Sequence, residues 1–262
     1  MNIRISLLLV LFVFITCADQ KTKQNINQQN ITEQPTEPLP DFDKIIEAHG
    51  GKVQWNSANT FQFTTNFPFE NSTYKVDLPN ERIHIQNNDF TAAFDGKDLW
   101  LQDENKILDQ QTFKRQFDLA YYIASGPFAF LQKGTLFTQR LDEEVMRKNY
   151  GVIHIGFGRG SGKSPDDEYV LYYDKETYKL AWFGYTVVNY GRYKSKRWEF
   201  VKYSSFQEVS GFEIPNSIEI FYGEKDMPSK LKRASTIENI EISDSVLPET
   251  LFEAPTESDF IN

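Results

Sequence analysis

Short apolar runs bounded by turn-forming residues recur along this chain, and the pattern restricts the fold to one built mainly from β-strands. The clearest instance is the stretch 166–188, in which the runs 169–173 and 180–188 flank a polar link over residues 174–177. Both runs are rich in Val, Tyr, Phe and Trp, which suit a pleated surface, and the link has the length of a short hairpin loop. The stretch predicts the central hairpin of a large antiparallel sheet, with other strands added on either side.

A two-residue period begins at Thr60 and makes one face of the next predicted strand strongly aromatic. Phe61, Phe63, Phe67 and Phe69 share that face and alternate with mainly polar residues. The further predicted strands cover residues 74–78, 82–86, 90–94, 99–102, 136–141, 151–157, 195–205, 206–209, 212–222 and 234–242, with a charged loop over 223–229. These elements predict a mainly β fold with a few helices (α+β), arranged as one large curved antiparallel sheet.

Two segments have the spacing of amphipathic helices. The first begins at Asp41 or Asp43 and is ended by the two glycines at 50 and 51, and we interpret His49 near its end as a packing or capping residue. The second, residues 111–125, carries Phe117 and Tyr121 on its apolar side and is stopped by the Gly-Pro pair that follows. Because the second helix lies between two sets of strands, we expect its apolar stripe to pack on the aromatic face of the sheet.

The N-terminal segment has the features of an export signal of a bacterial lipoprotein. An apolar run over residues 7–15, too short to span a bilayer, ends next to Cys17, the only cysteine in the chain. Residues 14–17, Phe-Ile-Thr-Cys, resemble the lipobox, in which the chain is cut before the cysteine and that cysteine is acylated. The usual motif has Leu in place of Phe14, and Gly, Ala or Ser in place of Thr16. The alternative is an ordinary signal peptide with a chance cysteine.

These features divide the chain into four parts: a signal peptide (1–16), the lipidated Cys17 with a disordered tether (17–40), one folded domain (41–256) and a C-terminal tail (257–262). The tether is rich in Gln, Asn and Thr and has almost nothing to bury. We expect the protein to be lipid-anchored in the cell envelope, at the outer membrane facing the periplasm. The residues after the cysteine do not by themselves choose between the inner and the outer membrane.

Charge and motif content argue against several classes of function. The net charge of −9 argues against a nucleic-acid partner. The three histidines are isolated, His84 and His154 are predicted on the polar face of strands, and no spacing suits a metal, so no metal or cofactor is expected. The glycine-rich segment 158–164 lacks both the spacing and the following helix of a P-loop. We assign no catalytic residue and expect a non-enzymatic protein; a hydrolase that uses two strand carboxylates is an alternative.

Five aromatic residues are candidates for lining a cavity for a hydrophobic ligand: Phe61, Phe63, Phe67, Phe117 and Tyr121. A curved sheet with an aromatic concave face and a helix across its mouth is the layout of such a cavity. We expect the gap between sheet and helix to be open, and the ligand to be a lipid, an acyl chain or another apolar molecule. The alternative is an envelope scaffold that fills its own sheet, binds no ligand and contacts a protein partner that the sequence does not identify.

Four short segments carry a resemblance to known proteins. They are Ala-His-Gly-Gly at 48–51 with the following Trp55, the strand 167–174, Gly-Phe-Glu-Ile-Pro at 211–215, and Leu-Phe-Glu-Ala-Pro at 251–255. With the order of the predicted elements, they resemble the lipoprotein-carrier superfamily typified by LolA and LolB, by way of a family of exported Gram-negative proteins. The resemblance covers about residues 41–256. It implies an unclosed β-barrel whose concave side takes acyl chains, with helices as a lid.

Overall fold

Thirteen strands and several short helices make up the computed structural model, which describes residues 40–158, 167–190 and 194–261. The strands are β1 (Thr60–Thr65), β2 (Ser72–Asp77), β3 (Arg82–Gln86), β4 (Thr91–Phe94), β5 (Leu99–Gln102), β6 (Thr135–Val145), β7 (Lys148–Phe157), β8 (Tyr169–Tyr173), β9 (Leu180–Tyr190), β10 (Lys194–Val209), β11 (Phe212–Glu224), β12 (Met227–Ser243) and β13 (Asp259–Ile261). The helices are α1 (Pro40–Ala48), α2 (Lys52–Trp55), α3 (Gln110–Gln116) and α4 (Leu119–Ser125), with the 3-10 helices η1 (Gly126–Leu131) and η2 (Glu249–Leu251).

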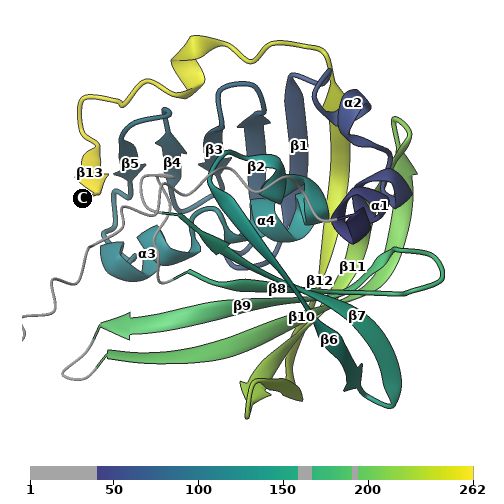
Figure 1. The fold of residues 1–262 in the computed structure, drawn as a ribbon. Coiled ribbons are helices and arrows are strands. Elements are labelled where there is room, and N and C mark those ends of the chain that lie inside the picture. The colour runs from purple at the N-terminus through teal and green to yellow at the C-terminus, as the bar shows by residue number, and fades with distance from the viewer. Residues whose placement is uncertain (1–39, 159–166, 191–193, 262) are drawn as a thin grey trace, which may run out of the picture. The chain divides into compact units, whose positions relative to one another are not determined.

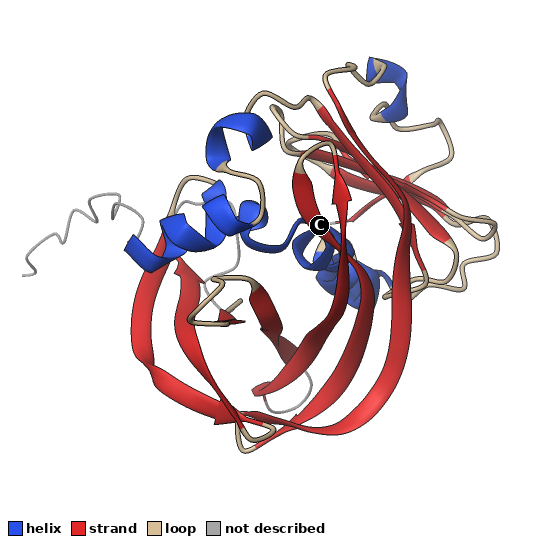
Figure 2. Ribbon diagram, turned by 90° about the vertical axis from the view of Figure 1, so that its right-hand side faces the viewer, coloured by secondary structure: helices blue, strands red, loops and turns tan. Residues whose placement is uncertain are grey.

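All thirteen strands belong to one antiparallel sheet, in the order β13-β5-β4-β3-β2-β1-β12-β11-β10-β9-β8-β7-β6 (Figure 1). The two ends of this order, β13 and β6, do not pair with each other, so the sheet is not closed into a barrel. The longer strands are strongly curved, and helices gather at one side of them (Figure 2). The predicted fold class, mainly β with a few helices and one large unclosed antiparallel sheet, is therefore confirmed.

The middle of the sheet is held by β12, the last long strand in the sequence. Its first half pairs with β11 as far as Thr236, and its second half, from Ile237, pairs with β1. The predicted hairpin of β8 and β9 is present, but it lies near the β6 edge, so the prediction that it is central was wrong. The apolar content of a strand indicates that the strand is buried. Its position in the order of the sheet depends instead on pairings between segments far apart in sequence.

Two hairpins at the same end of the molecule have tighter turns than the sequence predicts. Lys225 and Asp226 join β11 to β12, and Met146 and Arg147 join β6 to β7; all four residues have positive φ. Two consecutive residues of this kind are typical of the type I′ turn, whose twist matches that of antiparallel strands. The predicted loop over 223–229 is therefore a two-residue turn, and charged residues on both sides of it belong to the strands.

The first strand is shorter than its aromatic alternation predicts. β1 ends at Thr65, and Pro68, which has no N–H to give to a neighbouring strand, follows within three residues. The Phe67 N–H instead bonds to the Thr65 hydroxyl at 3.3 Å. Phe67 and Phe69 lie in the connection between β1 and β2 rather than in the strand, and both side chains are nevertheless buried.

The helical insertion between β5 and β6 is broken rather than continuous. The segment predicted as one helix over 111–125 forms α3 and α4, which meet at Phe117 and Asp118. Asp109 caps α3 by accepting a 2.8 Å hydrogen bond from the Thr112 N–H. The break gives the two helices different environments, because six of the seven residues of α4 are buried, whereas Phe113 is the one buried residue of α3.

Both faces of the sheet carry apolar clusters. The main core lies on the face that the helices cover, which we call the helix-covered face, and it includes Phe42 of α1, Phe128 of η1 and Phe183 of β9. A second cluster lies on the opposite face of the long strands, and its buried members are Val145, Tyr150, Val152, Val170, Tyr172, Trp182, Phe200 and Phe221. The long strands are thus apolar on both faces, which explains why their sequences read as continuous runs.

The C-terminal segment, yellow in Figure 1, returns to the opposite face of β3–β5 and covers it. Phe252 packs there against Trp100, whose indole N–H donates a 2.8 Å hydrogen bond to the Phe252 carbonyl. Residues 259–261, predicted as part of a tail, pair with the free edge of β5 as β13, and Ile261 is buried. The prediction that His84 lies on a polar strand face was wrong: it pairs in register with Ala93, a member of this cluster, and is only 5% exposed.

The turn after α1 connects that helix to the sheet through His49 and Gly50. His49 is 1% exposed, its Nδ1–H donates to the Ile45 carbonyl at 2.8 Å, and its carbonyl accepts a 3.1 Å bond from the Glu213 N–H. Gly50 has φ +121°, and a Cβ at this position would lie 2.6 Å from Phe212 Cδ1. The prediction that His49 is a packing residue is confirmed, and the glycine is required by both conformation and space.

The burial of His49 makes the fold sensitive to acid. Burial lowers the pKa of His49 to about 4, from 6.5 for the exposed group, against the opposing effect of its bond to Ile45. Between these two values the unfolded chain binds a proton that the folded chain does not, so stability is full above pH 6.5 and falls as the pH drops toward 4. We expect this group to contribute a loss of about 3 kcal/mol by pH 4.

Urea titrations of the parent and of His49→Gln at pH 7 and pH 4.5 test this. We expect the variant to be less stable at pH 7 but to lose less stability on acidification. An equal loss in both proteins would contradict the assignment.

Candidate functional site

The five predicted cavity residues all reach the main core, but they do not form one group. Phe61 and Phe63 project from β1 with no exposed surface, and their ring centres are 5.0 Å apart. Tyr121 of α4 lies above them, with its ring centre 6.5 Å from that of Phe61. This part of the predicted arrangement, a helix tyrosine over the strand phenylalanines, is present.

Phe117 belongs to a neighbouring group of rings under α3. Its ring centre lies 5.7 Å from that of Phe113, which in turn lies 5.2 Å from Phe69 and 5.4 Å from Phe90. Since Phe113 is the one buried residue of α3, this group of rings holds α3 on the sheet. The sequence pattern identifies Phe117 as buried but not which phenylalanines it contacts.

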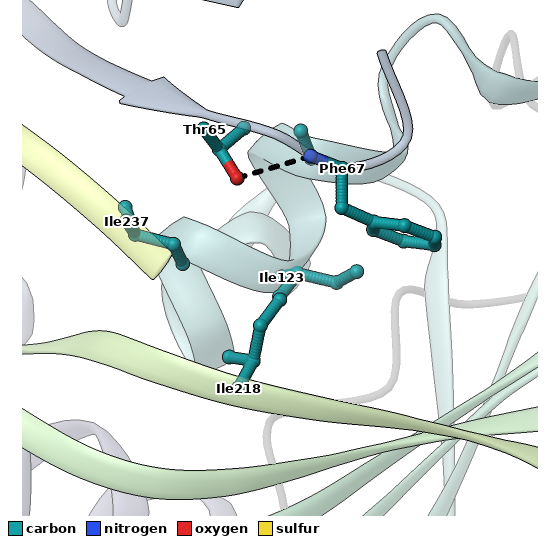
Figure 3. Close-up of a pocket in the computed structure, with 6 residues that line it drawn as sticks. Thr65, Phe67, Ile123, Ile218 and Ile237 are labelled. Atoms are coloured by element: carbon teal, nitrogen blue, oxygen red, sulfur yellow. Dashed lines mark hydrogen bonds between the residues drawn. The ribbon is translucent and has the colours of Figure 1, made fainter. Parts of the chain in front are cut away.

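Phe67 lines a narrow apolar gap between α4 and the sheet. Figure 3 shows Phe67, Thr65, Ile123, Ile218 and Ile237 around this gap, and Ala120 completes its lining. The gap has no room for a water molecule. The expectation of an open gap was therefore wrong for this structure, because the side chains of the chain itself fill the space between helix and sheet.

Tyr74 is a site residue that the predictions omit. It faces Phe63 across the β1–β2 pair, and the two rings stack 4.8 Å apart at 3°. The side chain is fully buried, and its hydroxyl has no hydrogen-bond partner among the residues that the structure describes. Burial raises the pKa of this hydroxyl well above its usual value, so it is present as an O–H donor. The alternation of Tyr74 and Val76 is the sequence signal that places Tyr74 on this face.

The attachment of α4 is much firmer than that of α3. The buried Tyr203 hydroxyl of β10 donates a 3.1 Å hydrogen bond to the Ile123 carbonyl. Tyr122 stacks on Tyr169 of β8, with ring centres 5.1 Å apart and an angle of 9°. A movement that uncovers part of the helix-covered face therefore meets less resistance at α3 than at α4.

A buried carboxylate marks the far end of the helix-covered face. The Glu199 side chain is 3% exposed and accepts hydrogen bonds from the Tyr185 hydroxyl at 2.8 Å, from Lys232 Nζ at 3.0 Å and from Arg197 at 3.0 Å. Burial raises the pKa of this carboxyl, but the bonds from Tyr185 and Lys232 outweigh it and hold the pKa below its usual value. Glu199 is thus an ionised, fully engaged carboxylate rather than a proton donor.

A polar hollow of about 410 Å³ lies where β11 and β12 separate. Hydroxyl and amide side chains dominate its lining, which consists of Ser205, Gln207, Asn216, Ser217, Thr236, Ile237, Glu238 and Asn239. It has the size of a ligand site but not the mainly apolar lining of most small-molecule pockets. None of the five predicted residues lines it.

Several predictions concern features outside the sheet core. The signal segment, Cys17, the predicted tether up to residue 39 and most of the glycine-rich segment 158–164 lie outside the described residues, whereas Pro40, predicted as the end of the tether, begins α1. Within the described ranges, no group of three His, Cys, Asp or Glu side chains could hold a metal ion. The helices of these same ranges are too short or too polar to cross a membrane.

No protein-family model and no curated protein matches this chain. Among solved structures it is similar to a LolA superfamily protein from Nitrosomonas europaea, at 14% identity and a TM-score of 0.47, over 80% of this chain and 96% of that chain. It is also similar to a DUF1329 family protein from Desulfovibrio piger, at 11% identity and a TM-score of 0.46, over 83% and 98% of the two chains.

Proposed function

We propose that this protein is a lipid-anchored, non-enzymatic envelope protein that binds a lipid, an acyl chain or another apolar ligand on its helix-covered face, beneath α3 and α4. The observation that carries the proposal is the group formed by Phe61, Phe63 and Tyr74, which Tyr121 of α4 covers next to the loosely attached α3. This surface is aromatic and contains one buried donor, the Tyr74 hydroxyl, that has no partner within the described part of the chain. An apolar ligand with an oxygen atom offers what the site lacks.

The site is closed in the described structure, so ligand entry requires α3 to move. The helix is short, its one buried residue is Phe113, and its remaining side chains are at least partly exposed. When the Phe113 and Phe117 rings leave the sheet, Phe69 and Phe90 become accessible to an acyl chain. The incoming chain replaces one set of apolar contacts with another, which keeps the net cost of opening low.

A second candidate function, a scaffold whose sheet is filled by its own side chains, is favoured by the absence of room for a water molecule in the gap under α4. A hydrolase that uses strand carboxylates has no comparable support. The buried carboxylate of the helix-covered face, Glu199, is held by two cations and a tyrosine and has a lowered pKa. A general acid needs the opposite shift.

Substitutions on the strand side and on the helix side of the site distinguish a ligand-binding protein from a scaffold whose own side chains fill the sheet. Phe63→Ala removes a fully buried ring, and we expect it to lower the free energy of unfolding by about 3–5 kcal/mol. Tyr121→Ala removes a partly exposed ring from the helix side, so it should cost less stability and should weaken binding of the neutral probe N-phenyl-1-naphthylamine. Probe fluorescence and thermal melting measure both effects. Phe260→Ala, which removes a ring that is 56% exposed on β13, is the matched control. If the parent protein does not bind the probe, the ligand-binding proposal fails and the scaffold function remains.

Tyr74→Phe tests the buried hydroxyl. Removal of a donor that lacks a partner should raise the free energy of unfolding by about 1 kcal/mol. Tyr203→Phe is the matched control, because its hydroxyl is buried but bonded to the Ile123 carbonyl, so its loss should lower stability by about 1 kcal/mol. We also expect Tyr74→Phe to weaken binding of a monoacylglycerol more than binding of N-phenyl-1-naphthylamine. A Tyr74→Phe protein less stable than the parent would show that the hydroxyl is already satisfied.

Cys17→Ser tests the lipid anchor. We expect this variant to leave the membrane fraction or to remain uncut, because the thiol that receives the acyl chains is absent. Thr16→Gly, which brings the motif closer to the usual lipobox, should be processed and stay with membranes. Cell fractionation with mass spectrometry of the N-terminus reads out both variants. A Cys17→Ser protein that is correctly cut and still sediments with membranes would refute the anchor.

A further inference from the structure

Three cations gather at the far end of the helix-covered face, in a chain whose net charge is −9. They are Arg197 of β10 and Lys232 and Arg233 of β12, and we call them the cationic rim. Arg197 and Lys232 bind the carboxylate of Glu199, which itself bonds to Tyr185 of the main core. Arg233 pairs in register with the buried Ile220 of β11, which places it on the same face.

The buried carboxylate positions the rim without neutralising it. Glu199 supplies one negative charge to two cations, and both partners keep part of their surface in solvent: the Lys232 side chain is 31% exposed and the Arg197 side chain 53%. Arg and Lys carry five and three N–H donors respectively, more than one carboxylate engages. Arg233 donates a 2.9 Å hydrogen bond to the Asn66 carbonyl and pairs with Glu70, whose side chain is 66% exposed, so a ligand can replace the Glu70 carboxylate at little cost.

The rim is continuous with the apolar part of the site. The Arg233 guanidinium carbon lies 5.8 Å from the centre of the Phe67 ring, and Phe67 lines the gap under α4 (Figure 3). Ile218, on the other side of that gap, is two residues from Ile220 along β11, which corresponds to about 7 Å. A molecule whose tail lies on the helix-covered face and ends beside Phe67 would therefore place its head at Arg233 and Lys232.

We propose that the cationic rim binds the anionic headgroup of an amphiphile whose tail lies on the helix-covered face. The ligand class is a carboxylate or phosphate ester attached to an acyl chain. This inference rests on the proposed function and narrows it, because it distinguishes acidic amphiphiles from neutral ones. The guanidinium of Arg233 suits the two oxygens of such a headgroup, and Lys232 adds a point charge beside it.

A pair of probes with the same tail tests the proposal: cis-parinaric acid and its methyl ester, each titrated by fluorescence into the full chain. We expect the acid to bind about 10-fold more tightly than the ester, as expected for a charge-assisted hydrogen bond. Arg233→Gln should reduce the difference in affinity between the acid and the ester several-fold, and it should leave the affinity for the ester unchanged. Its charged partner Glu70 is mostly exposed, so this variant leaves no buried charge unpaired, and thermal melting checks that loss of its bond to the Asn66 carbonyl leaves the protein folded. The combined variant that adds Arg197→Gln, Lys232→Gln and Glu199→Gln removes all three rim cations together with the buried carboxylate, so it leaves no buried charge unpaired and should abolish the preference for the acid.

Lys202→Gln is the matched control, because Lys202 is a partly exposed strand lysine that pairs with Glu219 on the opposite face. It should keep the full preference of the parent for the acid. Equal binding of acid and ester by the parent would overturn this proposal alone, whereas binding of neither probe would overturn the proposed function and this proposal together. Inorganic phosphate that competes with the acid at equal concentration would also overturn it, because the site would then recognise a free anion without a tail.

Discussion

The rest of the sheet depends on one strand, β12, which changes its hydrogen-bonding partner from β11 to β1 partway along its length. Up to Thr236 this strand extends the group of long strands, and from Ile237 it extends the group of short ones that begins with β1. Since β11 and β1 both pair only with β12 on one side, each half of the sheet is attached to the other through this strand. The separation of β11 from β12 opens the polar hollow at the fork, and the helices close the helix-covered face beside it.

Most strands are readable from local pattern, because a period of two and a turn signal are properties of neighbouring residues. Pairings between distant segments are not, and they account for the main errors. Nothing near Asp259 indicates that β13 completes the free edge of β5, and nothing near His84 indicates that Phe252 packs on the same face of the sheet as Ala93, its partner in register. The type I′ turn at 225–226 is missed for a different reason, since Lys and Asp seldom adopt two positive φ values in succession.

In the candidate site too, local sequence patterns predict some residues, whereas other features depend on segments far apart in the sequence. Phe61 and Phe63 follow from alternation, and Tyr121 follows from helical spacing. Whether the gap is open or closed does not follow from the local pattern, because it depends on how far α4 lies from the sheet. Tyr74 and Glu199 acquire their importance from what surrounds them: in the described ranges the Tyr74 hydroxyl has no partner, and the Glu199 carboxylate has three. Neither condition can be read from a single strand.

A closed aromatic site restricts its own ligands through the cost of opening. Complete exposure of a buried phenylalanine costs about 1.5–3 kcal/mol, so lifting Phe113 and Phe117 from the sheet costs roughly 3–6 kcal/mol. Burial of each methylene stabilises the complex by about 0.8 kcal/mol. A tail of roughly four to eight methylenes therefore offsets the free energy of opening, before the entropy of association is counted. A hydrogen bond to the Tyr74 hydroxyl relieves a further cost of about 1–3 kcal/mol. Small hydrocarbons meet neither condition, whereas a medium or long acyl chain with an oxygen-bearing head meets both.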